Sequence, residues 1–196
     1  MYQLKPLHLI RVISLLVFSV WSTSNAPNAH AAGDLPRSRV LDDVHQYYQR
    51  EMECGPVAMR MVLAYYDVDL STSAIKDEIF TDEAVGTRPE DLAEYPKSHG
   101  FKTRVVSGSI DELARSIADG CPVIVRQWKT DEAMEEGTVS HYRVVIGYDF
   151  DTQMIYMRDP SRSGLSSASF QKFNELWDVQ KERGLSTKNW MLIVYE

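Results

Sequence analysis

The chain carries apolar side chains at helical spacing in Cys54-Gly-Pro-Val-Ala-Met-Arg-Met-Val-Leu-Ala-Tyr-Tyr66. This pattern predicts a helix with one face buried in a protein core. Pro56 suits its first turn, where a backbone N–H is not required. Cys54 is therefore expected at a helix N-terminus, where partial positive charge and free N–H groups stabilise a thiolate.

Outward from this helix, the pattern is helical in the first half of the chain and strand-like in the second. Further helices are predicted over residues 71–80, 87–99 and 109–120, the last two opening with the capping-box patterns Thr87-Arg-Pro-Glu90 and Ser109-Ile-Asp-Glu112. Short β-branched or aromatic runs predict strands over residues 101–106, 123–128, 140–148, 154–158 and 190–195. This segregation predicts an α+β domain whose mainly antiparallel sheet comes from the C-terminal half.

The first residues have a different composition from the rest. The basic residues Lys5 and Arg11 precede an apolar run over residues 12–21. The small-x-small site Ala29-His-Ala31 follows that run. This order is typical of a secretory signal peptide, and the run is shorter than the roughly twenty residues that a membrane-spanning helix needs. We expect a signal peptide over 1–31 and one exported domain over 32–196, periplasmic or extracellular. An uncleaved anchor starting near Leu7 is the alternative.

The charge of the chain narrows the range of partners. Removal of residues 1–31 would take away two basic residues and no acidic one, so the formal charge would fall from −7 to −9. An acidic surface repels phosphate backbones, and therefore no nucleic-acid partner is expected. His45 and His99 lack partners at metal-ligand spacing, and we expect no metal or other cofactor.

A candidate base and its partner follow from a predicted hairpin. The run beginning at His141 is expected to pair with the strand over 154–158 through a turn over 150–153. Folding the hairpin brings Asp159 beside His141. A carboxylate there would hold the imidazole and favour the imidazolium that pairs with a thiolate, which makes Cys54, His141 and Asp159 a candidate triad.

Three blocks of the sequence resemble a known family. They are Gln49-Arg-Glu-Met-Glu-Cys54 with the helix that follows, Ser140-His-Tyr-Arg-Val-Val-Ile-Gly-Tyr148, and Tyr156-Met-Arg-Asp-Pro160. In this order and spacing they are similar to the bacteriocin-processing peptidases, family thirty-nine of the cysteine peptidases, in the papain-like superfamily. The resemblance implies a papain-like fold and a Cys54, His141 and Asp159 triad that cleaves peptides, in many relatives leader peptides ending in two small residues.

The resemblance also implies a glutamine that binds the oxyanion, with two candidates in this sequence. The family usually has it six residues before the cysteine, whereas Gln49 lies five before and Gln46 eight before. We expect Gln49 to serve, together with backbone N–H groups. Many relatives are fused to an ATP-driven transporter, but this chain has no phosphate-binding Gly-rich loop with Lys and Ser or Thr, so no nucleotide is expected.

Two other functions remain compatible with these residues. The same triad could pass the acyl group to another acceptor or trim an amide, because papain-like sites differ mainly in the nucleophile admitted to the acyl-enzyme. Alternatively, the only two cysteines, Cys54 and Cys121, could form a disulfide in an exported, catalytically silent binding domain. The substrate and the oligomeric state are left open.

Overall fold

A computed structural model describes residues 35–83, 85–129, 139–177 and 188–196. The predicted signal peptide over 1–31 lies outside these residues. Among the described residues, no helix has both the length and the apolar character needed to cross a membrane.

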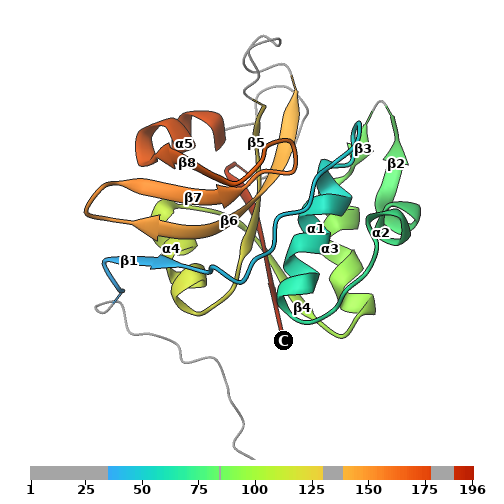
Figure 1. Cartoon of the computed structure of the whole chain (residues 1–196), viewed down its shortest axis with the longest axis horizontal. Coiled ribbons are helices and arrows are strands. Elements are labelled where there is room, and N and C mark those ends of the chain that lie inside the picture. The colour runs from blue at the N-terminus through green and yellow to red at the C-terminus, as the bar shows by residue number, and fades with distance from the viewer. Residues whose placement is uncertain (1–34, 84, 130–138, 178–187) are drawn as a thin grey trace, which may run out of the picture.

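A group of three helices comes from the first half of the chain. These are α1 (Cys54–Tyr65), α2 (Thr72–Ile79) and α3 (Pro89–Ser98), which lie together to the right of the sheet in Figure 1. A short antiparallel pair, β2 (Phe80–Asp82) and β3 (Gly86–Thr87), accompanies them. The helix that opens at Cys54 is confirmed, and it is mostly buried, as its apolar spacing predicts.

The larger sheet comes mainly from the second half of the chain. Its strand order is β4-β9-β5-β6-β7-β8, and β1 pairs with the end of β6. Every recorded pairing in it is antiparallel. The strands are β1 (Ser38–Val40), β4 (Lys102–Ser107), β5 (Val123–Trp128), β6 (Ser140–Asp149), β7 (Met154–Arg158), β8 (Leu165–Ser169) and β9 (Trp190–Tyr195). The predicted α+β class and strand segments are confirmed.

Helices cover the sheet from several sides and close one continuous core. Helix α1 packs against β5 and β6, α4 (Ile110–Ala118) against β1, β5 and β6, and α5 (Phe170–Trp177) against β5, β7 and β8. The core joins residues of the helices and of the sheet in one cluster. Figure 1 shows the helical group and the sheet meeting along α1, so the start of α1 lies at the seam between them.

The structure confirms the predicted helix cap at Ser109 and contradicts the one predicted at Thr87. Ser109 caps α4 by accepting a hydrogen bond from the Glu112 N–H at 3.1 Å. Thr87 does not cap α3, because the N-cap residue is Arg88. Pro89 explains the difference: a proline takes the first helical position and holds the residue before it in an extended conformation. Thr87 belongs to β3 instead.

Candidate active site

The nucleophile candidate Cys54 is the first residue of α1 and is half-buried. The backbone N–H groups of Gly55 and Tyr142 lie near its sulfur and lower the pKa of the thiol. Gly55 is required here by packing, because an added Cβ would lie 2.6 Å from the Cβ of Thr87. The space beside Gly55 is therefore filled by β3. The sulfur lies at the N-terminus of α1, beside β6.

The base candidate His141 lies near the start of β6 and is 2% exposed. Its Nε2 is 2.8 Å from Oδ1 of Asp159, and its ring lies close enough to the side chain of Cys54 for the thiol to raise the pKa of His141. Because Nε2 is used by the carboxylate, the nitrogen left for the sulfur is Nδ1. The structure thus brings together the thiol, the imidazole and the carboxylate of the three predicted residues.

Asp159 follows directly after β7 and is 1% exposed. Oδ1 accepts hydrogen bonds from His141 and from the backbone N–H and hydroxyl of Ser161, at 2.8 and 2.7 Å for the last two. Burial raises the pKa of Asp159, but the hydrogen bond and charge of His141, the charge of Arg143 and the Ser161 hydroxyl outweigh it and hold the pKa well below its usual value. The carboxyl group is therefore ionised.

The thiol of Cys54 and the imidazole of His141 shift each other's pKa in opposite directions. Burial raises the pKa of Cys54, but hydrogen bonding to His141, the charge of His141 and the two backbone N–H groups lower it overall. Burial lowers the pKa of His141, but hydrogen bonds to Asp159 and Cys54 together with their charges raise it overall. Both shifts favour a thiolate paired with an imidazolium, which is the reactive form of a cysteine nucleophile.

The two glutamine candidates lie beside the end of β7 and differ in their bonds. Gln46 donates from Nε2 to the carbonyl oxygens of Tyr47 and Asp159, at 2.8 and 3.0 Å. Both of its amide hydrogens are therefore engaged. Gln49 donates from its backbone to the Pro160 carbonyl at 2.9 Å, and its side-chain oxygen is buried with no partner among the described residues. The side-chain oxygen of Gln46 is likewise buried with no partner among the described residues. The two glutamines therefore differ in the amide nitrogen, which in Gln46 is bonded to two backbone carbonyls.

The two cysteines are separate and reduced. Cys121 is half-buried, and its thiol is hydrogen-bonded to Tyr66, the residue at the C-terminal end of α1. Cys54 opens the same helix, whose 12 residues give a length of about 18 Å. A disulfide needs Cα atoms within about 7 Å. The Cys54–Cys121 bridge considered from the sequence is therefore incompatible with this fold.

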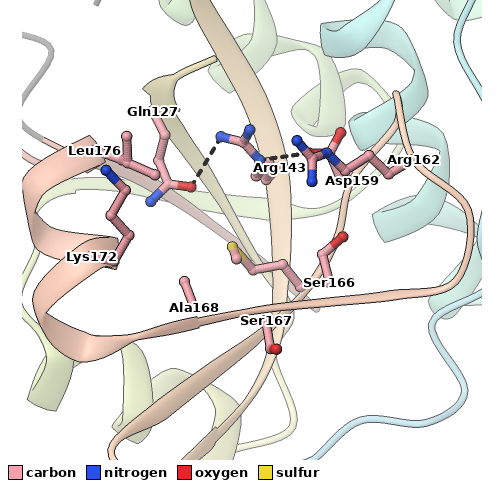
Figure 2. A pocket seen from close by; sticks show the side chains of 10 residues that line it. Gln127, Arg143, Asp159, Arg162, Ser166, Ser167, Ala168, Lys172 and Leu176 are labelled. Atoms are coloured by element: carbon pink, nitrogen blue, oxygen red, sulfur yellow. Dashed lines mark hydrogen bonds and ion pairs between the residues drawn. The ribbon is translucent and has the colours of Figure 1, made fainter. Parts of the chain in front are cut away.

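Arg143 is a member of the site that we did not predict from the sequence. It lies two residues after His141 on β6, is 4% exposed, and places Nε 2.7 Å from Oδ2 of Asp159. Figure 2 shows this ion pair and the contact of Arg143 with Gln127. A signal was present, because an arginine within a strand predicted to be buried needs a carboxylate, and a strand places residues i and i+2 on the same face.

No group of three or more His, Cys, Asp and Glu side chains in the described ranges is arranged to hold a metal ion. The histidines His45 and His99 do not join the site. His45 is exposed, and His99 ends α3 with its ring against Tyr95.

Known proteins share this architecture. A family model described as "Peptidase_C39 like family" matches residues 41–185. Among curated proteins, no sequence matches the chain significantly.

Three solved structures illustrate the likeness. A putative C39-like peptidase from Bacillus anthracis has a TM-score of 0.62 at 21% identity, covering 81% of this chain and 98% of that one. A double glycine motif protease from an AMS/PCAT transporter, in complex with the leader peptide, gives 0.57 at 18%, covering 78% and 91%. The peptidase domain of Streptococcus ComA, a bi-functional ABC transporter, gives 0.56 at 19%, covering 76% and 96%. At these identities the likeness shows the fold, and the expected papain-like architecture is confirmed.

Proposed function

Because the chain belongs to the peptidase C39-like family, we propose that it hydrolyses peptide bonds with Cys54 as nucleophile, His141 as general base and acid, and Asp159 as the group that orients His141. One observation carries the proposal: the buried imidazole of His141 is hydrogen-bonded to the Asp159 carboxylate and also lies close enough to the Cys54 side chain for the two to shift each other's pKa. This is the arrangement in which a thiolate is activated and a proton is ready for the leaving group.

Acylation begins with the thiolate of Cys54 attacking the carbonyl carbon of the scissile peptide bond. The carbonyl π electrons move to the oxygen, which becomes an oxyanion bonded to a tetrahedral carbon. The imidazolium of His141 then gives its proton to the leaving nitrogen as the C–N bond breaks. An amine leaves, and the acyl group stays on the sulfur as a thioester.

Deacylation uses the same side chains in reverse. Neutral His141 takes a proton from water while the water oxygen attacks the thioester carbonyl. The C–S bond breaks, a carboxylic acid leaves, and the thiolate and imidazolium are restored. The oxyanion of both steps needs hydrogen-bond donors, and we assign these to the side-chain amide of Gln49 and to backbone N–H groups at the start of α1. The bonds that hold Gln46 to the backbone support Gln49 for this role.

The substrate that we propose is a peptide or protein segment, bound at the seam where α1 meets the sheet. The complex of a similar fold with a leader peptide supports a peptide ligand for this architecture. Cleavage after two small residues is the form of this reaction that the family resemblance suggests, so a library should include such sequences beside random ones.

A cleavage profile tests the proposal. The full chain is incubated with a peptide library, and the new termini are identified by mass spectrometry. We expect cleavage by the wild type and by Cys121→Ala, since Cys121 lies at the far end of α1, and none by Cys54→Ala or His141→Ala. Cleavage that continues in Cys54→Ala would refute the role of the thiol. A folded wild type that cleaves no peptide, and whose Cys54 resists alkylation, would refute the reaction itself.

We also propose that the chain is exported and cleaved after Ala31. Support comes from the order of charge, apolar run and small-x-small site in its first residues. Fractionation of expressing cells, followed by the mass of the N-terminal peptide, tests this. A mature protein outside the inner membrane that begins at Ala32 is expected, and an intact Met1 in a membrane fraction would favour the uncleaved anchor.

A further inference from the structure

Asp159 has two oxygens, and the structure divides their partners between them. Oδ1 accepts hydrogen bonds from His141 and Ser161, whereas Oδ2 accepts one from Nε of Arg143 at 2.7 Å. Rotation of the carboxylate about its last bond would break contacts on both oxygens together. The bond at Oδ2 therefore acts together with the two bonds from Ser161 to set which way Oδ1 points, and Oδ1 is the atom that holds the imidazole.

Arg143 is itself fixed by groups that do not belong to the triad. Its Nη1 donates to Oε1 of Gln127 at 3.3 Å and to the carbonyl of Trp128 at 3.2 Å. Gln127 in turn donates from Nε2 to the Phe173 carbonyl of α5 at 3.2 Å. A continuous line of bonds thus runs from α5 through Gln127 and Arg143 to the carboxylate.

The strand register explains why this line forms. His141 and Arg143 are two residues apart on β6, so their side chains leave the same face of the sheet. Gln127 on β5 is the Cα partner of His141 in the antiparallel ladder, and cross-strand partners place their side chains side by side. The sheet therefore holds Gln127, His141 and Arg143 on one face, and β7 delivers Asp159 to them.

We propose that Arg143 is a positioning residue for the reaction: its bond to Oδ2 fixes the Asp159 carboxylate in the orientation that aligns His141 with Cys54. This rests on the hydrolysis proposed above, because alignment has a kinetic consequence only if the three side chains catalyse. In this role Arg143 does not contact the substrate. A change at Arg143 should therefore alter turnover and not substrate binding. A misplacement of about 1 Å at a catalytic group can cost about a hundredfold in rate.

A cavity gives direct access to this contact. It has a volume of about 190 Å³ and is lined by Arg143, Asp159, Gln127, Met157 and residues of β8 and α5. Figure 2 shows the Arg143–Asp159 pair on one side of this cavity, with Lys172 and Leu176 across from it. Arg162 and Lys172 at its margin are exposed, so the cavity opens to solvent. A small guanidinium ion could therefore replace the missing side chain of an Arg143 variant.

The experiment measures kcat and KM for a peptide that the wild type cleaves, in Arg143→Ala and Arg143→Lys. In Arg143→Ala we expect kcat to fall about tenfold to a hundredfold with KM unchanged, and millimolar guanidinium to restore part of the kcat. Arg143→Lys keeps the charge but lacks the planar Nε donor, so its kcat should be intermediate. Arg104→Ala removes an exposed arginine that is paired with Glu112, and its kcat should neither fall nor respond to guanidinium.

Several results would overturn the inference. A folded Arg143→Ala protein with wild-type kcat would do so, as would a rise in KM that accounts for the whole loss. Equally decisive would be a folded Arg143→Ala protein whose lost kcat is recovered neither by guanidinium nor by the lysine variant. If Arg143→Ala does not fold, Arg143→Lys decides: lower kcat at constant KM supports the role, and wild-type kcat refutes it.

A spectroscopic measurement separates this inference from the proposed function. The Nε2 proton of His141, bonded to Asp159, should give a downfield proton resonance in the folded protein. We expect this resonance to shift or broaden in Arg143→Ala and to stay in place in Arg104→Ala. Such a change in a protein that cleaves no peptide would refute the hydrolysis while leaving the placement of the carboxylate intact. No change at all would refute the positioning role.

Discussion

The Nε2 atom of His141 lies 2.8 Å from Oδ1 of Asp159, and the two residues are 2% and 1% exposed. The buried carboxylate is held by His141, Arg143 and Ser161, so the imidazole bonded to it has little freedom to turn. In Asp159→Asn the negative charge that favours the imidazolium of His141 is lost, and the amide can turn an N–H toward the ring where an acceptor is needed, so the reactive thiolate–imidazolium pair is less populated. We expect kcat to fall by about a hundredfold to ten-thousandfold. Steady-state kinetics of the folded variant measures this, and an unchanged kcat would contradict the orienting role.

The reactivity of Cys54 should depend on the charge of His141. The pKa of Cys54 is lowered overall, since the hydrogen bond and charge of His141 outweigh burial. With Cys121→Ala as background, iodoacetamide should alkylate Cys54 well below pH 8.5, about where an ordinary thiol titrates. In His141→Ala the lowering contribution is lost, the pKa rises, and the alkylation rate near neutral pH should fall at least about tenfold. The same pH profile in both proteins would be inconsistent with a thiolate–imidazolium pair.

Acid should destabilise the fold through Asp159. The pKa of this buried carboxyl is lowered by His141 and Arg143, against the effect of burial. Below about pH 4 the unfolded chain takes up a proton that the folded chain does not, so the free energy of unfolding falls with pH, by up to about 1.4 kcal/mol per pH unit. Urea unfolding at a series of acidic pH values tests this.

Asp159→Asn is the control for the acid effect. It should be less stable at neutral pH, because Arg143 is left buried without its carboxylate. Its free energy of unfolding should nevertheless decline less steeply below about pH 4. Equal slopes in the two proteins would assign the acid sensitivity to other carboxyl groups.

The two glutamines form a matched pair for the oxyanion. Gln49→Ala should lower kcat by about a hundredfold to a thousandfold, because one donor to the developing charge is removed. Gln46→Ala should mainly lower stability, by about 1 kcal/mol, since its amide bonds to the carbonyls of Tyr47 and Asp159. Kinetics and urea unfolding of both variants distinguish these outcomes. A larger loss of kcat in Gln46→Ala than in Gln49→Ala would reverse the assignment.

Gly55 should tolerate no side chain. An alanine Cβ would lie 2.6 Å from Cβ of Thr87, and forcing such overlap into a packed site costs about 1–3 kcal/mol. Gly55→Ala should lose stability of this size in urea unfolding. The double variant Gly55→Ala, Thr87→Gly should recover part of it, because the opposing side chain is gone. Wild-type stability in the single variant would show that β3 can move aside.

Much of the fold followed from local patterns that tertiary packing reinforces. The strands over 123–128 and 140–148 were predictable because long β-branched runs match a sheet buried on both faces. Strand β8 was missed, since its central residues Ser166 and Ser167 give no strand signal and its pairing with β7 supplies the order. Helix α5 was missed although Phe170, Phe173 and Trp177 have helical spacing.

The candidate site was predictable to the extent that it depends on a hairpin. The pairing of β6 with β7 brings Asp159 to His141, and short antiparallel connections can be inferred from sequence. The contact of Cys54 with His141 was a hypothesis from the chemistry of the two residues, supported by the family resemblance, because residues 87 positions apart meet only through tertiary packing. Arg143 was not predicted because Asp159 was taken as the partner of His141 alone. A carboxylate has two oxygens and can bond to both residues.

The sulfur and the imidazole are carried by different parts of the molecule, Cys54 by the helical group and His141 by the sheet. Neither part contains a working pair alone. A slippage of α1 across β6 by little more than the width of an atom would disconnect them while leaving every helix and strand intact. Catalytic activity is thus more sensitive to small displacements than the fold is. Under mildly denaturing conditions it would be lost before the protein unfolds.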